Sequence, residues 1–259
     1  MTPMTVVILA AGMGTRLGRP LPKPLTPLAD GHTILARQVS CITKVWPDAH
    51  LIIVVGFKMD LVMESTPDAL FVYNEAYDRT NTARSLQRAL RLAPRGPVVW
   101  MNGDVVFDPR VLTRVDEYIE TDTSMVCVNS ASVGDEEIKY SLDPSGAISR
   151  LSKSVPDAIG EAVGINLVSA TDRPLLLRHL AQCADNDYFE RAIETAIERD
   201  QMTVAPLHID DLFAVEVDFE EDLLRANEQA LTDGATTYNS PAEQLRAPGK
   251  DAVRRSSRR

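Results

Sequence analysis

Short apolar runs alternate with segments of helical periodicity along most of the chain. A short apolar or period-2 run predicts a strand, and apolar residues every three to four positions predict a helix. Strands are predicted at residues 5–10, 51–55, 70–73 and 97–101, all four as buried strands, and at 124–128, 138–142, 147–151, 163–168 and 213–217. Helices are predicted at residues 34–45, after Asn81, from Asp108 and Pro109, after Thr171, at 187–199 and after Asp218. This alternation predicts an α/β fold with one Rossmann-like mixed sheet flanked by helices.

The chain divides into one long patterned region and a short tail. The pattern ends near Asp233, which predicts a single domain over residues 1–233. From Asn239 onward, six basic residues stand among two acids, prolines, a glycine and serines. This composition does not support a packed core, so residues 234–259 are predicted to be a disordered basic tail.

Composition excludes several classes of function. The formal net charge is −10, and because the tail carries +4, the rest of the chain carries −14. Binding of nucleic acid needs clustered Lys and Arg, so no nucleic-acid partner is expected. No run approaches the roughly 20 apolar residues of a membrane span, so we expect no membrane contact and a cytoplasmic protein. The three widely spaced cysteines predict free thiols, and the oligomeric state stays open, a homo-oligomer included.

A glycine-rich turn follows the first predicted strand. Residues 10–18 read AAGMGTRLG, and the backbone N–H groups of such a turn can bind phosphates. Dinucleotide-binding folds use a similar turn, but there it leads directly into a helix. Here prolines follow at once, and each costs about 3 kcal/mol in a helix interior. They are Pro20, Pro22, Pro24 and Pro27. The segment is therefore predicted to be a stiff loop that wraps a ligand.

Two cations lie on this loop. Arg16 and Lys23 are tethered by glycines on one side and by prolines on the other. Cations held beside a triphosphate can neutralise charge at the α-phosphate and on the departing pyrophosphate. We therefore predict that Lys23 and Arg16 are catalytic, with Lys23 at the reacting phosphorus and Arg16 at the pyrophosphate.

The stretch LAAGMGTRLGRPLPKPL resembles the signature of the nucleotidyltransferase superfamily that activates sugar phosphates and alcohol phosphates. The chain is most similar to the phosphocholine and phosphonate cytidylyltransferase branch of that superfamily. The resemblance implies a nucleotidyltransferase fold, with CTP or another NTP bound over the glycine turn. The nucleotide-binding residues that it implies are Leu9, Ala10, Ala11, Gly12, Gly14, Thr15, Arg16, Lys23, Asn81, Ser85, Gly103 and Asp104.

Two aspartates match the magnesium-binding positions of that family. Asp104 follows an apolar strand, where ligands of open α/β sheets collect, and Asp218 follows another. Mg²⁺ prefers carboxylate and phosphate oxygens, so the resemblance implies an Mg²⁺ cofactor held by Asp104 and Asp218. Without the loop signature, the favoured interpretations would be a turn residue at Asp104 and a helix N-cap at Asp218. Asn102 stands where some relatives carry another acid, and we do not count it as a ligand.

Candidate acceptor-binding residues lie in the second half of the chain. Lys139 and Lys153 could meet an anionic acceptor, and Tyr188 is an aromatic candidate. Glu161 matches a Glu-x-x-Gly-Ile segment that relatives use near the acceptor. A quaternary ammonium would call for an aromatic cage, but both tryptophans fall in the first half. A small phosphonate or alcohol phosphate is therefore favoured over choline phosphate.

The predicted reaction is magnesium-dependent transfer of CMP from CTP to this acceptor, with release of pyrophosphate. A sugar-1-phosphate nucleotidyltransferase using dTTP, UTP or GTP would share the loop signature and is the nearest alternative. An inactive regulatory domain of the same fold would not need both loop cations together with both aspartates. A glycosyltransferase would not need the proline-braced loop.

Overall fold

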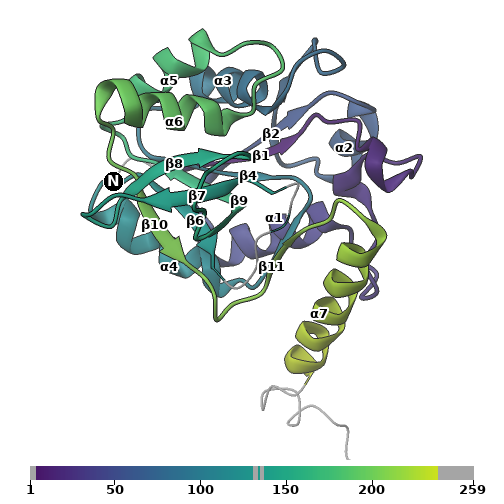
Figure 1. Cartoon of the computed structure of the whole chain (residues 1–259). Coiled ribbons are helices and arrows are strands. Elements are labelled where there is room, and N and C mark those ends of the chain that lie inside the picture. The colour runs from purple at the N-terminus through teal and green to yellow at the C-terminus, as the bar shows by residue number, and fades with distance from the viewer. Residues whose placement is uncertain (1–3, 131–133, 135–136, 239–259) are drawn as a thin grey trace, which may run out of the picture.

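A mixed β-sheet forms the centre of the molecule in the computed structural model, which describes residues 4–130, 134 and 137–238 (Figure 1). Among these residues, nine strands form the sheet in the order β10-β6-β9-β4-β1-β2-β3, with the β7–β8 hairpin joined to β9. The strands of the sheet are β1 (Thr5–Ala10), β2 (His50–Val55), β3 (Leu70–Tyr73), β4 (Val98–Asn102), β6 (Met125–Asn129), β7 (Lys139–Leu142), β8 (Ile148–Ser152), β9 (Gly160–Val168) and β10 (Ala205–His208). Strands β5 (Val105–Phe107) and β11 (Ala214–Glu216) form a separate antiparallel ribbon.

Helices cover both faces of the sheet (Figure 1). One face carries α3 (Thr82–Leu92), α5 (Arg173–Gln182) and α6 (Phe189–Asp200), and the other carries α1 (Ile34–Val45), α2 (Met59–Ser65) and α4 (Arg110–Glu120). Strand β1 is buried throughout, and its side chains alternate between the two cores: Val7 and Leu9 join the first, Val6 and Ile8 the second. A fully apolar strand is what burial on both faces requires. The predicted fold class, a single-domain mixed sheet flanked by helices, is confirmed.

The structure differs from the sequence-based prediction in four elements. The segment 70–73 is a strand, but it is wrong as a buried one, because β3 lies at the edge of the sheet and Leu70 is 57% exposed. Helix α2 and strands β5 and β10 were not predicted. Helix α2 and strand β5 are too short for a clear period, and β10 contains Pro206, which is tolerated because β10 is an edge strand.

Helix starts follow the predicted caps closely. Asn81 caps α3, with its side-chain oxygen accepting the N–H of Thr82 at 2.9 Å. Helix α4 begins one residue after Pro109, and Asp108 accepts the N–H of Arg110 at 2.8 Å. These short polar side chains satisfy N–H groups that the first turn of a helix leaves without a partner.

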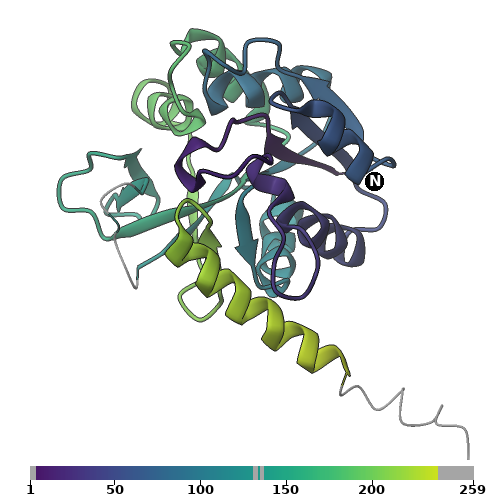
Figure 2. The same cartoon turned by 90° about the vertical axis from the view of Figure 1, so that its right-hand side faces the viewer.

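The last described helix, α7 (Glu220–Tyr238), leads away from the body of the molecule (Figures 1 and 2). Its buried residues Leu223 and Ala226 pack in a third apolar cluster with Val106 and Val215 of the β5–β11 ribbon. Figure 2 shows that the start of α7 lies beside the loop after β1. Asp218, just before this helix, is thereby placed against a loop about 200 residues earlier in the chain. Residues 239–259, where most of the predicted tail falls, lie outside the described residues. In the described part of the chain, no helix is long and apolar enough to cross a bilayer.

Candidate active site

A cavity of about 360 Å³ opens at the carboxyl ends of β1 and β4. Twelve of the residues predicted as site residues line it: Leu9, Ala10, Gly12, Gly14, Arg16, Lys23, Asn81, Gly103, Asp104, Lys153, Tyr188 and Asp218. Ligand sites of open α/β sheets form at this edge, because the loops that leave neighbouring strands diverge there. The cavity is therefore the candidate active site.

Two glycines allow the loop after β1 to lie close to its neighbours. Gly14 has a φ of +62°, and a Cβ atom there would stand 2.6 Å from Cγ of Lys23. A Cβ atom on Gly103 would stand 2.9 Å from the carbonyl oxygen of Leu9 and 2.9 Å from Cγ of Pro24. Glycine at these positions lets the loop carry Lys23 directly over the ends of β1 and β4.

A cluster of opposite charges lies at one side of the cavity. Nζ of Lys23 bonds to Asp104 Oδ2 at 3.0 Å and also to Asp218 Oδ1. Arg16 contacts the other oxygen of Asp218 at 2.9 Å. Burial works to lower the pKa of Lys23, but the charges and hydrogen bonds of the two aspartates outweigh it and raise that pKa. Burial works to raise the pKa of Asp218, but Lys23 and Arg16 outweigh it and lower that pKa. Both groups are thus ionised at neutral pH.

The two aspartates have the geometry and chemistry to share a metal cation. Asp104 and Asp218 already converge on one cationic atom, Nζ of Lys23. Their carboxylate oxygens are the hard ligands that Mg²⁺ prefers, usually together with substrate phosphates and water. No group of three or more His, Cys, Asp or Glu residues that could hold a metal ion occurs among the described residues. The pair therefore fits a cation that also takes ligands from a bound nucleotide.

Four of the predicted site residues do not line this cavity. Ser85 is buried in α3 and accepts a hydrogen bond from Asn74 Nδ2 at 3.0 Å, and Ala11 is also buried in the core. Lys139 and Glu161 face each other across β7 and β9, and Glu161 accepts the N–H of Gly134 at 3.0 Å. The backbone of Thr15 begins a 3₁₀ turn (Thr15–Leu17), and its side chain lies outside the described part of the structure.

Three glutamates on the cavity wall were not predicted. Glu137 precedes β7, Glu190 lies in the first turn of α6, and Glu216 ends β11. Two of them carry a signal that a closer reading of the sequence could have used. Glu216 interrupts the apolar run AVEV of a predicted strand, and Glu190 falls between Phe189 and Ala192 on the apolar face of a helix. An acid on a buried face needs a partner or a function.

Burial and mutual repulsion perturb these carboxyl groups. Burial raises the pKa of Glu190 to about 7. Burial, with the charges of Glu161 and Asp218, raises the pKa of Glu137 to about 7. Burial, with the charge of Asp104, raises the pKa of Glu216 well above its usual range. Clusters of perturbed acids in a cavity are typical of functional sites.

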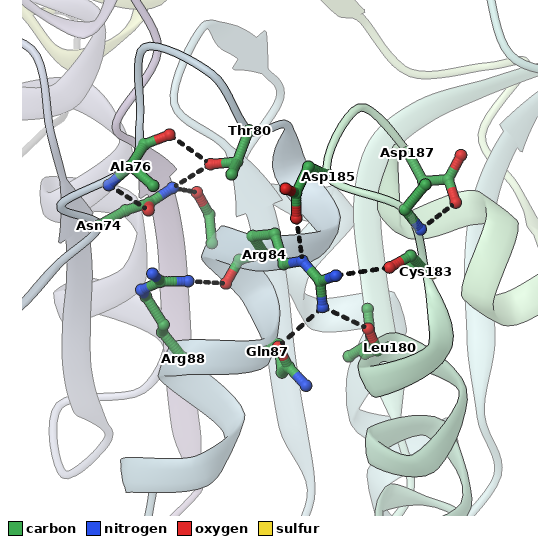
Figure 3. Close-up of polar contacts among 12 residues, drawn as sticks. Asn74, Ala76, Thr80, Arg84, Gln87, Arg88, Leu180, Cys183, Asp185 and Asp187 are labelled. Carbon is green, nitrogen blue, oxygen red and sulfur yellow. Dashed lines mark hydrogen bonds and ion pairs between the residues drawn. The ribbon is translucent and has the colours of Figure 1, made fainter.

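The wall that carries Tyr188 and Glu190 is fixed to α3 by a polar network (Figure 3). Arg84 donates to Asp185 Oδ1 at 3.0 Å and to the carbonyl oxygen of Cys183 at 2.6 Å. The backbone N–H of Asn81 donates to the carbonyl oxygen of Asp185 at 2.8 Å. These bonds hold the loop between α5 and α6, so they set where α6 begins and where Glu190 points.

Comparison with known proteins is consistent with this architecture. The family model described as "MobA-like NTP transferase domain" matches residues 6–206. The CMP-5'-(3-aminopropyl)phosphonate synthase of Streptomyces rubellomurinus is 37% identical over 122 residues, which cover 44% of this chain and 19% of that protein. The chain spans about a fifth of the length of the first curated relatives that it matches.

Solved structures share the fold over most of the chain. The inositol-1-phosphate CTP transferase from T. maritima matches with a TM-score of 0.71 at 15% identity, covering 89% of this chain and 97% of that one. A UDP-glucose pyrophosphorylase complexed with UDP-glucose matches with a TM-score of 0.69 at 15% identity, covering 90% of this chain and 100% of that one. At such identities the likeness concerns the fold alone.

Proposed function

Because the chain belongs to the MobA-like NTP transferase domain family, we propose that it is a cytidylyltransferase that transfers CMP from CTP to a small phosphonate or alcohol phosphate. The observation that carries the proposal is the contact of Lys23 with Asp104 and Asp218 beside the glycine turn. This arrangement offers backbone N–H groups and cations to a triphosphate, and two carboxylates to a metal. The choice of CTP and of a phosphonate is supported by the similarity to the Streptomyces relative, which is named a CMP-5'-(3-aminopropyl)phosphonate synthase.

In the proposed reaction, an oxygen of the acceptor's phosphonate or phosphate attacks the α-phosphorus of CTP. A bond forms between that oxygen and phosphorus, the bond from phosphorus to the bridging oxygen breaks, and its electron pair leaves with pyrophosphate. The attacking oxygen is already ionised at neutral pH, so no general base is needed. Catalysis then rests on positioning and on stabilisation of charge.

The loop residues supply that stabilisation. Lys23, cationic because of its two aspartates, stabilises the negative charge at the α-phosphate, and Arg16 that on the pyrophosphate. Asp104 and Asp218 would hold Mg²⁺, which when bound neutralises phosphate charge. Gly12 and Gly14 let the loop backbone approach the phosphates.

Pyrophosphate release with Mg²⁺ tests the proposal. CTP, UTP, dTTP, ATP and GTP are each paired with 2-aminoethylphosphonate, phosphocholine and glucose 1-phosphate. We expect release with CTP and 2-aminoethylphosphonate in preference to phosphocholine. Release with glucose 1-phosphate alone would instead identify a sugar-1-phosphate nucleotidyltransferase.

The variant Lys23→Ala tests the role of the loop. We expect kcat to fall by ~10² to 10³, the usual effect of removing one group that stabilises transition-state charge. The exposed Lys44→Ala is the matched control and should keep wild-type turnover. Near wild-type turnover in Lys23→Ala would show that this role is wrongly assigned.

A further inference from the structure

Three acidic side chains line the cavity in addition to the loop cations and the two aspartates. Glu137, Glu190 and Glu216 line it, and Lys153 is a cation on the same wall. Nζ of Lys153 lies 5.3 Å from the ring centroid of Tyr188, so this ammonium lies over the tyrosine ring. A wall with an excess of carboxylates disfavours a purely anionic ligand and favours one that brings a positive charge.

One oxygen of this wall is buried without a partner. Glu190 is 6% exposed, and its Oε2 has no hydrogen-bond partner. A buried polar atom without a partner is costly, and in native proteins such atoms are paired with protein, water or ligand. Because a carboxylate oxygen accepts hydrogen bonds, the partner that fits it is a donor, and a cationic donor fits best.

The aromatic residues of the wall are not arranged as a cage. The ring of Phe189 is buried and packs edge-on against Trp100, with ring centroids 5.5 Å apart. The ring of Tyr188 is already in contact with Lys153. A quaternary ammonium has no N–H and is bound by stacked aromatic faces, whereas a primary ammonium donates hydrogen bonds to carboxylates.

We propose that the acceptor carries a protonated primary amine besides its phosphonate or phosphate, and that Glu190 Oε2 accepts a hydrogen bond from this ammonium. The proposal rests on the proposed function. Glu137 and Glu216 line the same cavity as Glu190. The anionic end of the acceptor would then meet Lys23 at the reacting phosphorus, and its cationic end would meet Glu190.

The electrostatics of Glu190 agree with such a ligand. Burial raises its pKa to about 7, the nearby Lys153 works to lower it, and Glu190 in turn works to raise the pKa of Glu216. An ammonium that binds beside such a carboxyl group favours its ionised form and lowers its pKa.

Two pairs of acceptors that differ in the nitrogen alone test the proposal. 2-Aminoethylphosphonate is compared with ethylphosphonate, and phosphoethanolamine with phosphocholine, each with CTP and Mg²⁺. We expect kcat/KM to favour the primary amine in both pairs by ~10² or more, since a site built to bind an N–H group rejects an analogue that lacks it. Equal use of the two members of either pair would overturn the proposal.

The variant Glu190→Gln tests the residue. It should reduce the preference for 2-aminoethylphosphonate over ethylphosphonate by about tenfold or more, mainly by raising the KM of the amine. Glu198→Gln is the matched control, because Glu198 is an exposed acid on the same helix, and it should keep the wild-type preference. An unchanged preference in Glu190→Gln would overturn the assignment.

Binding measured by calorimetry without CTP separates this proposal from the proposed function. If no acceptor releases pyrophosphate from CTP, the proposed function is wrong. Tighter binding of 2-aminoethylphosphonate than of ethylphosphonate, lost in Glu190→Gln, would still support the amine site. Release of pyrophosphate with both probes alike would leave the proposed function intact and overturn the amine site. Absence of both binding and turnover would overturn both.

Discussion

The environments of Lys23 and Glu190 affect their charged forms in opposite ways. Lys23 is stabilised as a cation by Asp104 and Asp218, and these contacts hold its ammonium at the cavity wall. Glu190 is buried with one unpaired oxygen, and burial outweighs the effect of the nearby cation Lys153 on its pKa. The first arrangement lowers the energy of the charged form, and the second raises it. The ionised form is therefore stabilised at Lys23 and destabilised at Glu190.

The raised pKa of Glu190 predicts a pH-dependent cost to stability. Its pKa rises from 4.5 to about 7, so the protonated form stabilises the fold below pH 4.5, and this contribution is lost as pH rises through 7. We expect the free energy of unfolding of Glu190→Gln to increase relative to wild type by about 3 kcal/mol from pH 4.5 to pH 8.

Urea unfolding of both proteins across this range measures the difference. Lys153 and Glu216 face Glu190 and are retained in both proteins, and because the charge of Glu190 raises the pKa of Glu216, the measured difference includes this coupling. Glu198→Gln should show a flat difference from wild type. A flat difference for Glu190→Gln as well would mean that the buried carboxyl is not perturbed.

At the scale of elements, the loop after β1 is held by both of its ends. Two short 3₁₀ turns (Thr15–Leu17 and Lys23–Leu25) replace the long helix that dinucleotide-binding folds place there. Pro24 and Leu25 are buried, which anchors the end of the loop that carries Lys23. The conformation of the loop is thus specified by its own sequence, and the loop forms a fixed part of the cavity wall.

Substitutions at two glycines of this loop distinguish the effect of backbone strain from the effect of displacing Lys23. Gly14 and Gly18 have similar positive φ angles, but an added Cβ meets Lys23 Cγ at 2.6 Å from Gly14 and nothing within 4 Å from Gly18. We expect Gly14→Ala to lower kcat by about tenfold or more because it displaces Lys23, and Gly18→Ala to show only the ~1 kcal/mol cost of the left-handed backbone. Steady-state kinetics and thermal unfolding of both variants would test this. Equal kinetic losses would show that the contact with Lys23 is immaterial.

At the scale of the whole molecule, the site is assembled from segments far apart in the chain. Asp104 follows the central strand β4, whereas Asp218 is brought to it by the β5–β11 ribbon and the start of α7. Lys23 joins them from a third segment, and Glu190 reaches the cavity because Arg84 and its partners fix the loop before α6. Correct packing of all these elements is a condition of activity.

This assembly predicts how the metal requirement changes. If Asp104 and Asp218 hold Mg²⁺ together, Asp104→Asn and Asp218→Asn should each raise the Mg²⁺ concentration for half-maximal turnover by about tenfold or more, because a carboxylate ligand is lost. EDTA should abolish pyrophosphate release by wild type, and excess Mg²⁺ should restore it. Asp116→Asn, a change away from the cavity, is the control. An unchanged Mg²⁺ dependence in both variants would exclude this ligand pair.

The sequence by itself determined the parts of this protein that depend on local chemistry. The buried β1, which is apolar from Val6 to Ala10, the glycines and prolines after it, and the cap at Asn81 follow from backbone and burial preferences of neighbouring residues, so they could be predicted. The family signature likewise pointed to Arg16, Lys23, Asp104 and Asp218, which the structure brings together.

Only the tertiary structure decided what depends on contacts between distant segments. It made β3 an edge strand, left Ser85 and Glu161 out of the cavity lining, and placed Glu137, Glu190 and Glu216 in it. Whether a carboxyl group faces solvent, core or ligand depends on which element packs over it. A periodic pattern records the burial of a position but not the identity of its neighbour, and it is the neighbours that give this cavity its two opposite charges.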